Sequence, residues 1–395
     1  MSLEKTRLEL GFIPLTDCAP LAAAQVLGFF EAEGLDVKLT AQASWANVRD
    51  RVAAGLLDGA HMLGPMTIAQ SLGIGGEPTA MAAPLALNLN GSAITVSTAV
   101  AEALRELDPL AMAARPPSSA PLARLAGIRR AAGAPPLTFA VVFPYSIHNY
   151  ALRDWLAAGG AAPDRDVRLT VIPPARMVEK LAAGDIDGFC VGAPWNTLAA
   201  ARGVGEILVR ARDWWGATPD KVLGFTRDWA GRHPETLLAV LRATMRGAAW
   251  ADAPENRATL AAILSRPEFV AVSERVLLRA LEAGDGDGIV FSRYAAGFPW
   301  RSHAAWFLSQ MTRWRQAPAE ADVEAAMAVY RPDLFREAAA ALGEPAPTVD
   351  AKLEGAHDAP WTLTEATAPI PMPADRFLTG EPFDWAKLMA TTPGT

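Results

Sequence analysis

An internal repeat limits the possible folds of this chain more than any other feature of its sequence. The segment VAAGLLDG at 52–59 recurs as LAAGDIDG at 181–188. Just upstream, DVKLT at 36–40 recurs as DVRLT at 166–170, at nearly the same offset along the chain. Chance likeness between alanine-rich helices would explain one such match but not an ordered series, so we infer two similar units.

Each copy has the pattern of a strand, a helix, a strand, a helix and a further strand. A third match supports this pattern, because the apolar run 8–13 with its following helix resembles 137–143 with its own helix. Short apolar strands that alternate with helices are typical of a parallel sheet covered on both faces. The sequence therefore predicts an α/β protein of two lobes, with a ligand cleft where the carboxyl ends of the strands face helix N-termini. Lobe 1 is expected to comprise 1–95 and 226–395, and lobe 2 to comprise 96–225.

Three segments outside the repeat have patterns of their own. The stretch from Pro116 to Pro136, with prolines at both ends, is predicted to be a surface insertion. Residues 234–330 are predicted to be helical. The tail from about residue 345 is rich in proline and acidic residues, and it is predicted to be a strap rather than a domain.

The composition excludes several classes of protein. The chain has 395 residues, of which 51% are hydrophobic and 20% charged, so a large buried core is expected. A net charge of -7 argues against direct contact with nucleic acid. The sequence contains no run of about 18 apolar residues, so we expect no membrane span. Two cysteines, Cys18 and Cys190, can form neither a disulfide framework nor a cysteine zinc cluster.

No motif of a common enzyme class is found in the sequence. It lacks G-x-S-x-G, H-E-x-x-H, a phosphate-binding GxxxxGK[ST] loop and a GxGxxG turn between a strand and a helix. Its five histidines are scattered, with no i, i+4 pair for a metal. We therefore expect no enzymatic activity, no cofactor and no metal. An enzyme that uses Cys18 or His148 stays open as an alternative.

Polar and aromatic residues lie at the ends of the predicted strands, where the cleft is expected. Ser44 is expected to cap a helix, which would leave backbone N–H groups and the Trp45 indole N–H free for an anion. Donors dominate these positions and carboxylates are few, which favours a small anion. The candidate ligand-binding residues are Ser44, Trp45, Ala46, Pro65, Gly91, Ser92, His148, Trp195 and Lys221.

Several of these residues also have an ordinary structural explanation. Trp45 and Trp195 would be packing residues at a helix start and at a turn. His148 would be a helix-cap or core histidine. Lys221 would be a solvated surface lysine, and its position beside a crossing between the lobes is what favours the anion interpretation.

At these same residues the sequence resembles a known family. The matching motifs are SWA at 44–46, DGAHMLGPM at 58–66, GAPWN at 192–196, KVLG at 221–224 and FLTGEPFD at 377–384. They resemble the nitrate- and bicarbonate-binding proteins of bacterial ABC uptake systems, and the cytoplasmic relatives of those proteins that sense nitrate. The resemblance implies a periplasmic-binding-protein-like fold of type II, whose two lobes close over a ligand.

The resemblance also implies roles for particular residues. In nitrate-binding members, residues that match Trp45, His148 and Lys221 contact the anion. Bicarbonate-binding members are expected to use an acidic residue with calcium at the position of Lys221, so a lysine there implies nitrate or nitrite as the ligand. Ser92 stands where the uptake proteins have glutamine, and this shorter side chain implies a recruited water or a different anion preference.

Two biological roles follow from the resemblance. The uptake proteins carry a leader and a lipid-anchor cysteine near the start, and this sequence shows neither pattern. We therefore expect a cytoplasmic nitrate or nitrite sensor whose partner is an RNA-binding antitermination regulator, held by ligand-dependent protein–protein contact. An acidic surface would suit such a basic partner. The alternative is the solute receptor of an ABC importer, which would dock on an ABC permease.

Overall fold

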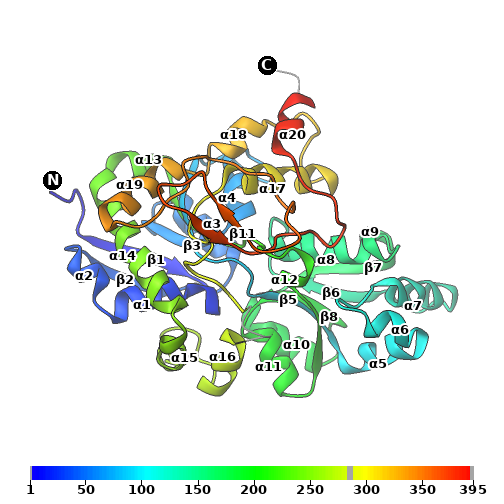
Figure 1. Cartoon of the computed structure of the whole chain (residues 1–395). Coiled ribbons are helices and arrows are strands. Elements are labelled where there is room, and N and C mark those ends of the chain that lie inside the picture. The colour runs from blue at the N-terminus through cyan, green and yellow to red at the C-terminus, as the bar shows by residue number, and fades with distance from the viewer. Residues whose placement is uncertain (1, 283–287, 392–395) are drawn as a thin grey trace.

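The computed structural model describes residues 2–282 and 288–391, and it contains two five-stranded mixed sheets (Figure 1). The first sheet, in lobe 1, has the order β2–β1–β3–β10–β4. Its strands are β1 Arg7–Phe12, β2 Asp36–Ala41, β3 Gly59–Leu63, β4 Met81–Ala86 and β10 Lys221–Thr226. The second sheet, in lobe 2, has the order β7–β6–β8–β5–β9. Its strands are β5 Ser92–Ser97, β6 Leu137–Val141, β7 Val167–Val171, β8 Gly188–Gly192 and β9 Gly205–Arg210.

The strand register confirms the internal repeat. In lobe 1, β1 runs parallel to both β2 and β3, and Leu10 pairs with Gly59. In lobe 2, β6 runs parallel to both β7 and β8, and Phe139 pairs with Gly188. The offset along the chain from Leu10 to Phe139 equals the offset from Gly59 to Gly188. The repeat read from the sequence is therefore a repeat of sheet topology and of register.

The Asp-Gly dipeptide has the same structural role in both copies. Asp58 Oδ2 accepts a hydrogen bond from the Glu9 backbone N–H at 2.9 Å, and Asp187 Oδ2 accepts one from Thr138 N–H at 2.7 Å. Each aspartate thus ties the turn before a third strand to the first strand of its own lobe. The following glycine is needed for space, because a Cβ on Gly59 would meet the Phe225 ring at 2.4 Å.

The chain crosses between the sheets twice, between β4 and β5 and again between β9 and β10. The predicted lobe boundaries, after residues 95 and 225, fall inside β5 and β10. In the structure the boundaries lie in the loops that precede these two strands. Pairing partners decide this placement, because β5 lies antiparallel between β8 and β9, and β10 lies antiparallel between β3 and β4. Hydrophobic pattern alone does not reveal which sheet a crossing strand joins.

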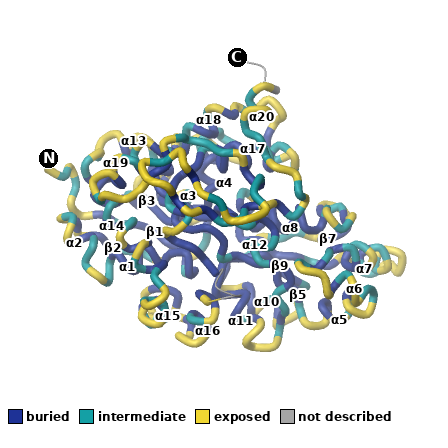
Figure 2. Tube along the Cα trace, viewed as in Figure 1, coloured by how far each residue is buried: buried dark blue, intermediate teal, exposed yellow. Residues whose placement is uncertain are grey.

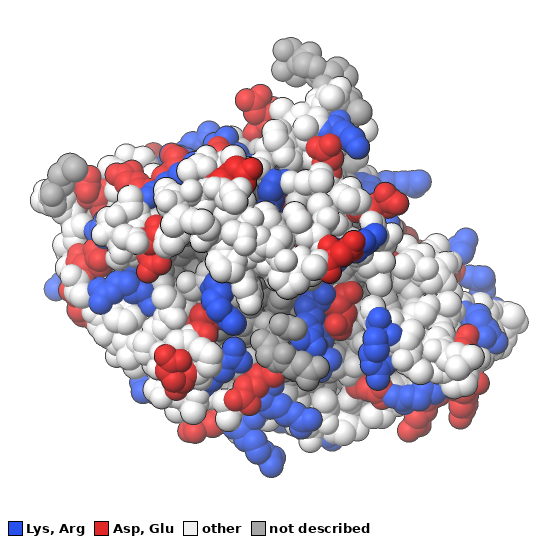
Figure 3. All heavy atoms as spheres, in the orientation of Figure 1, with Lys and Arg blue, Asp and Glu red and all other residues white. Residues whose placement is uncertain are grey.

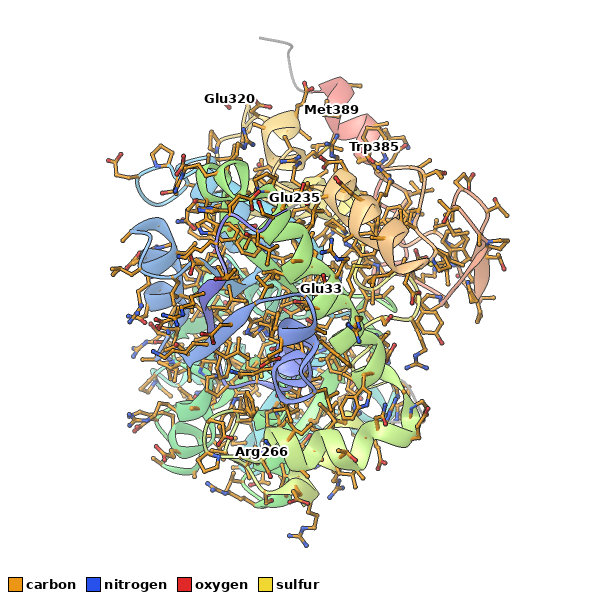
Figure 4. The ribbon with its side chains drawn as sticks, turned by 90° about the vertical axis from the view of Figure 1, so that its left-hand side faces the viewer. Glu33, Glu235, Arg266, Glu320, Trp385 and Met389 are labelled. Carbon is orange, nitrogen blue, oxygen red and sulfur yellow. The ribbon has the colours of Figure 1, made fainter. Side chains whose placement is uncertain are left out.

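Helices cover both sheets. Those of lobe 1 are α1 Ala19–Val26, α2 Phe29–Ala32, α3 Trp45–Ala53, α4 Gly64–Ser71, α13 Arg227–Arg232, α14 Pro234–Asp252, α15 Arg257–Leu264, α16 Glu274–Leu281, α17 Arg301–Arg313, α18 Val323–Met327 and α19 Pro332–Leu342, with the 3₁₀ turns η1 Thr16–Cys18 and η3 Pro254–Asn256. The helical prediction for 234–330 is confirmed for α14 to α18. In Figure 4, α2 and α14 lie side by side, and Arg242 Nε of α14 donates to Glu33 Oε2 at 2.8 Å.

The stretch from Pro116 to Pro136, predicted to be a surface insertion, contains a helix that packs on its neighbours. The helices of lobe 2 are α5 Thr98–Leu107, α6 Pro109–Ala113, α7 Ala120–Ala131, α8 Ile147–Ala158, α9 Pro163–Asp166, α10 Met177–Ala182, α11 Trp195–Ala201 and α12 Ala211–Trp214, with the 3₁₀ turn η2 Pro174–Arg176. The Trp155 indole N–H of α8 donates to the Pro117 carbonyl at 3.0 Å, which anchors the segment. Pro116 and Pro117 precede α7, Pro121 lies in its first turn, and Pro135 and Pro136 follow it.

The C-terminal tail lies across both lobes, as the prediction of a strap requires (Figure 1). It contains the hairpin β11 Trp361–Leu363 and β12 Ile370–Met372, followed by α20 Trp385–Thr391. Phe377 packs on Trp215 of lobe 2 with ring centroids 4.5 Å apart, and the Leu378 N–H donates to the Trp214 carbonyl at 2.7 Å. Trp306 of α17 joins the same group, 5.2 Å from Trp215. This aromatic cluster holds the tail, lobe 1 and lobe 2 together.

The inner strands are buried, whereas the edge strands β2 and β7 and the outer turns of the helices are partly exposed (Figure 2). The inner strands β3 and β8 are buried at every residue and β10 at all but its last, and β3 and β10 carry two of the residues discussed below, His61 and Lys221. Across the ranges 2–282 and 288–391, no helix is both long and apolar enough to cross a bilayer.

Replacing Asp187 with alanine is expected to lower the free energy of unfolding by about 1–3 kcal/mol, because the Thr138 N–H loses its acceptor. Urea denaturation measures this change. The matched control is Asp185→Ala in the same turn, where the exposed carboxylate forms an ion pair with the exposed Lys180, and we expect a change within about 0.5 kcal/mol. Equal losses in the two variants would contradict the role assigned to Asp187.

Candidate functional site

Six polar and aromatic side chains meet between the two sheets, at the strand ends that face the opposite lobe. They are Asp17 in η1, Trp45 in α3, His61 in β3, His148 in α8, Asp220 just before β10 and Lys221 at its first position. We call this group the buried polar cluster, because none of its members is more than 2% exposed. Burial of so many polar groups in one place requires an explanation, since each is costly to remove from water.

Local helix capping positions two members of the cluster. Ser44 Oγ accepts the Asn47 N–H at 3.2 Å, which starts α3 with Trp45 as its first residue. Ser146 Oγ accepts the Asn149 N–H at 3.1 Å, which starts α8 and places His148 in its first turn. Both caps have the extended backbone typical of an N-cap serine.

Lys221 lies at the centre of the cluster, between two carboxylates. Its Nζ is 2.9 Å from Asp17 Oδ2 and 2.6 Å from Asp220 Oδ2. The other side of each carboxylate faces a histidine, because His61 Nε2 is 2.9 Å from Asp17 Oδ1 and His148 Nε2 is 3.6 Å from Asp220 Oδ2. The Trp45 ring completes the arrangement, with its centroid 5.6 Å from Lys221 Nζ and 5.2 Å from the His61 ring.

Most polar atoms of the cluster lack an aligned hydrogen-bond partner, although several lie within ion-pair distance of one another. Among the described residues, thirteen buried side-chain nitrogen and oxygen atoms have no such partner, and eight of them belong to the cluster. These eight are Asp17 Oδ1, Trp45 Nε1, His61 Nε2, both ring nitrogens of His148, both carboxylate oxygens of Asp220 and Lys221 Nζ. Buried polar groups are normally hydrogen-bonded, so this concentration indicates a binding site.

Burial and neighbouring charges set the pKa values in the cluster. Burial raises the pKa of Asp17, but the Lys221 and His61 contacts outweigh it, so the pKa of this carboxyl lies well below its usual range. For Asp220, burial dominates over the opposing effect of Lys221, and its pKa rises to about 7. The two carboxylates raise the pKa of Lys221 despite burial, so the lysine is charged. One permanent cation therefore stands between a permanent anion and a carboxyl that titrates near neutral pH.

Both histidines of the cluster are neutral. Burial lowers the pKa of His61, and it lowers that of His148 well below the ordinary value, where Lys221 adds to the effect. His61 Nδ1 accepts the Ile13 N–H at 3.3 Å, so the ring proton is on Nε2, facing Asp17. Neither ring nitrogen of His148 is hydrogen-bonded within the described part of the chain, so the ring is free to donate to a ligand.

The lobes are closed over the cluster. The Thr16 N–H donates to the Ala193 carbonyl of lobe 2 at 2.9 Å, and the Trp195 indole N–H of α11 donates to the Pro14 carbonyl of lobe 1 at 3.3 Å. A pocket of about 400 Å³ opens nearby between the lobes, lined by residues of α3 and α4 together with Phe143 and Tyr145. α3 extends from this pocket to Trp45 in the cluster.

The structure brings together only three of the nine predicted site residues, namely Trp45, His148 and Lys221. Trp195 contributes to lobe closure and Ser44 to capping. The other four border the site through the backbone or by packing: Ala46 in α3, Pro65 in α4, Gly91 with φ +88° at the crossing, and Ser92, which starts β5 and pairs with Gly192. None of these six belongs to the group of unpartnered polar atoms among the described residues.

The sequence analysis did not select three members of the cluster, namely Asp17, His61 and Asp220. Asp17 follows β1, Asp220 precedes β10, and each is a lone acidic residue in an apolar context. Their position at strand ends was available as a signal, but an expected anion site gave no reason to choose carboxylates. His61 lies inside β3, where an alternating pattern does not distinguish a ligand from a core residue.

The two cysteines are unsuited to nucleophilic chemistry. Burial raises the pKa of Cys18 and of Cys190 above the ordinary range of a thiol, and the charges of Asp17 and Asp220 respectively add to the effect. Both side chains are 1% exposed. Because the thiolate is the nucleophile, neither residue supports the enzyme alternative.

Comparison with known proteins places the chain in a family. The profile of the family described as NMT1-like matches residues 1–265. The chain belongs to the NMT1-like family. It is 35% identical over 363 residues to the nitrate/nitrite binding protein NrtA of Synechocystis, covering 87% of this chain and 78% of that protein. The crystal structure of the periplasmic nitrate-binding protein NrtA from Synechocystis PCC 6803 matches with a TM-score of 0.83 at 30% identity, covering 99% of this chain and 98% of that one.

Two longer relatives are also similar to the chain. The nitrate import ATP-binding protein NrtC of Synechocystis is 36% identical over 371 residues, covering 90% of this chain and 52% of that protein. The bicarbonate transport ATP-binding protein CmpC of Synechococcus elongatus is 35% identical over 348 residues, covering 86% and 50% respectively. The chain thus spans about half the length of these relatives. The family and the two-lobed, periplasmic-binding-protein-like fold expected from the sequence are both confirmed.

Thiol labelling checks the assignment of both cysteines to the core. We expect no reaction of the native protein with a coloured disulfide reagent over minutes at pH 8, and two thiols per chain in denaturant, because burial excludes the reagent and keeps the thiols protonated. Rapid labelling of one thiol in the native protein would show an accessible thiolate and would return the enzyme alternative to consideration.

Proposed function

We propose that the chain binds nitrate or nitrite between its two lobes, at the buried polar cluster. The observation that carries this proposal is the set of donors on Trp45, His148 and Lys221, which meet from both lobes and from the crossing segment. The Trp45 indole N–H and the His148 ring have no hydrogen-bond partner among the described residues, and Lys221 adds a positive charge between two carboxylates. A planar oxyanion with three or two oxygens can accept from an indole N–H, an imidazole N–H and an ammonium group at once. The names of the nitrate-binding relatives support the same ligand.

Bicarbonate is the competing ligand, since one group of relatives is named for bicarbonate transport. The lysine at position 221 favours nitrate or nitrite, because the resemblance implies an acidic residue and calcium at this position in bicarbonate-binding members. Among the described residues, no group of three or more His, Cys, Asp or Glu side chains is arranged to hold a metal ion. Lys221 Nζ occupies the position between the two aspartates instead.

The structure supports a binding protein rather than an enzyme. Two of the relatives are named as nitrate-binding proteins, and the two cysteines are buried and protonated. Closure of two lobes over a small ligand couples binding to shape, because a ligand that touches both lobes stabilises the closed form. Such a change of shape can be read by a protein partner.

Two roles are compatible with this binding function. The first is the sensor predicted from the sequence, which would be cytoplasmic and would bind an RNA-binding antitermination regulator in a nitrate-dependent manner. The second is the receptor of an ABC importer for nitrate, and the names of the relatives fit this role at least as well. Figure 3 shows acidic and basic residues interspersed on one face, so the net charge of -7 is not gathered there into a patch for a basic partner.

Two measurements, one with each candidate partner, separate these roles. The sensor role predicts that the purified chain retains an RNA-binding antitermination regulator, and that nitrate changes the affinity. The importer role predicts that the chain stimulates ATP hydrolysis by its ABC permease complex only when nitrate is present. If the chain neither retains the regulator nor stimulates the permease complex, both roles are contradicted and a different partner must be sought.

Isothermal titration calorimetry tests the ligand itself. We expect heat of binding with nitrate or nitrite, and a Kd that rises about tenfold to a hundredfold in Trp45→Phe, because one hydrogen bond to the anion, worth about 1.5–3 kcal/mol, is lost while an aromatic ring is kept. Trp361→Phe on the half-buried hairpin strand β11 is the matched control and should bind as the wild type does. No heat and no thermal shift at millimolar nitrate and nitrite would refute the proposal.

A further inference from the structure

We propose that the site takes up its anion together with one proton, that Asp220 accepts this proton, and that the ligand is therefore a monovalent rather than a divalent oxyanion. This inference rests on the proposed function, because it concerns the same buried polar cluster. It begins from the charges that surround the position where the anion would lie.

The cluster already carries more negative than positive charge. Asp17 and Asp220 are two carboxylates, Lys221 is one cation, and both histidines are neutral. These groups are at most 2% exposed, so water does not screen them. With both aspartates ionised, the net charge of the cluster is about −1, and a bound monoanion would make it more negative, about −2. Charge buried without compensation is strongly unfavourable, so a proton must accompany the anion.

Asp220 is the less compensated of the two carboxylates. Asp17 is in contact on both oxygens, with Lys221 Nζ at 2.9 Å and the His61 Nε2–H at 2.9 Å. Asp220 meets Lys221 with Oδ2 alone, and the neutral His148 is 3.6 Å from the same oxygen. Asp220 Oδ1 has no hydrogen-bond partner within the described residues. The second oxygen of Asp220 is therefore the place where an added proton costs least.

Apart from Lys221 of β10, the groups that face Asp220 supply no positive charge. They are Asp17 from η1, His148 from α8, Cys190 from β8 and Tyr330 from the turn after α18. Burial raises the pKa of both Cys190 and Tyr330, so these two residues stay neutral. Lys221 is the single cation within ion-pair distance of either aspartate in the described part of the chain.

The titration of Asp220 agrees with this geometry. Its pKa, raised by burial to about 7, already places proton exchange within the physiological range. A bound anion is a further negative charge nearby, so it raises this pKa again and draws a proton onto the carboxyl. The protonated carboxyl gains an O–H that can donate to the anion, which converts a repulsive neighbour into a donor. A monoanion and one proton together add no net charge to the cluster, whereas a dianion with one proton would add one negative charge.

Calorimetry of the wild-type protein in buffers of different protonation enthalpy measures the proton directly. At pH 8, above the pKa of Asp220 in the free site, we expect net uptake of up to one proton per nitrate bound. The Kd should rise about tenfold from pH 8 to pH 9 and change little below pH 6. Nitrate binding without proton uptake would overturn this inference and leave the proposed function intact, whereas absence of binding would overturn both.

The Asp220→Asn variant assigns the proton, because an amide has the shape of a protonated carboxyl and cannot ionise. We expect it to bind nitrate with no proton uptake and with a Kd that is the same at pH 7 and pH 9. Asp228→Asn, on the exposed start of α13, is the matched control and should keep the wild-type pH dependence. A wild-type pH dependence in Asp220→Asn would assign the proton to another group and overturn the role of Asp220. If this variant does not fold, proton uptake by the wild type still decides whether the anion binds together with one proton.

Sulfate tests the charge of the ligand. We expect no heat with sulfate at a concentration that saturates the site with nitrate, measured at pH 7 in the same buffer, because the second negative charge would stay uncompensated. Sulfate binding within tenfold of the nitrate affinity would overturn the restriction to monovalent anions.

Discussion

The contact of Lys221 with Asp17 and Asp220 is the interaction on which the rest of the site depends. Asp17 follows the first strand of lobe 1, and the other two residues stand where the chain returns from lobe 2. One ammonium group thus holds together the two places from which the cleft is built. A buried ion pair rarely contributes much stability, because desolvation offsets the attraction. Its presence is better explained by the anion-binding function proposed above.

The two lobes share a scaffold but divide the chemistry between them. The offset that relates β3 to β8 places Cys190 of β8 at the position of His61 in β3, and Ser146 at the position of Asp17. Lobe 1 thus supplies a carboxylate and an imidazole where lobe 2 supplies a neutral thiol and a hydroxyl that caps α8. Lobe 2 contributes His148 from the first turn of that helix. A duplicated fold has therefore acquired an asymmetric cleft, with the charged groups on lobe 1 and at the crossing.

Individual elements show which features of the fold the sequence pattern alone predicts. The repeat predicted both sheets, because strand and helix periods and the Asp-Gly turns are local properties. The prolines between 116 and 136 predicted a surface insertion, but they did not reveal that this segment contains the helix α7. At Lys221 the pattern allowed a solvated lysine, yet the side chain is completely buried, because β10 inserts between β3 and β4. Insertion of a strand into a sheet depends on partners remote in sequence, so no local signal reports it.

The sequence by itself determined the repeat, the α/β class, the helix cap at Ser44 and the family, since each is recorded in short stretches of residues. Only the tertiary structure decided that two aspartates and His61 share the site with Trp45, His148 and Lys221. These residues are scattered from position 17 to position 221, and they meet because two crossings fold one lobe over the other. Their charges shift one another's pKa values strongly only when the groups are about 3 Å apart and shielded from water. Lobe closure creates both conditions.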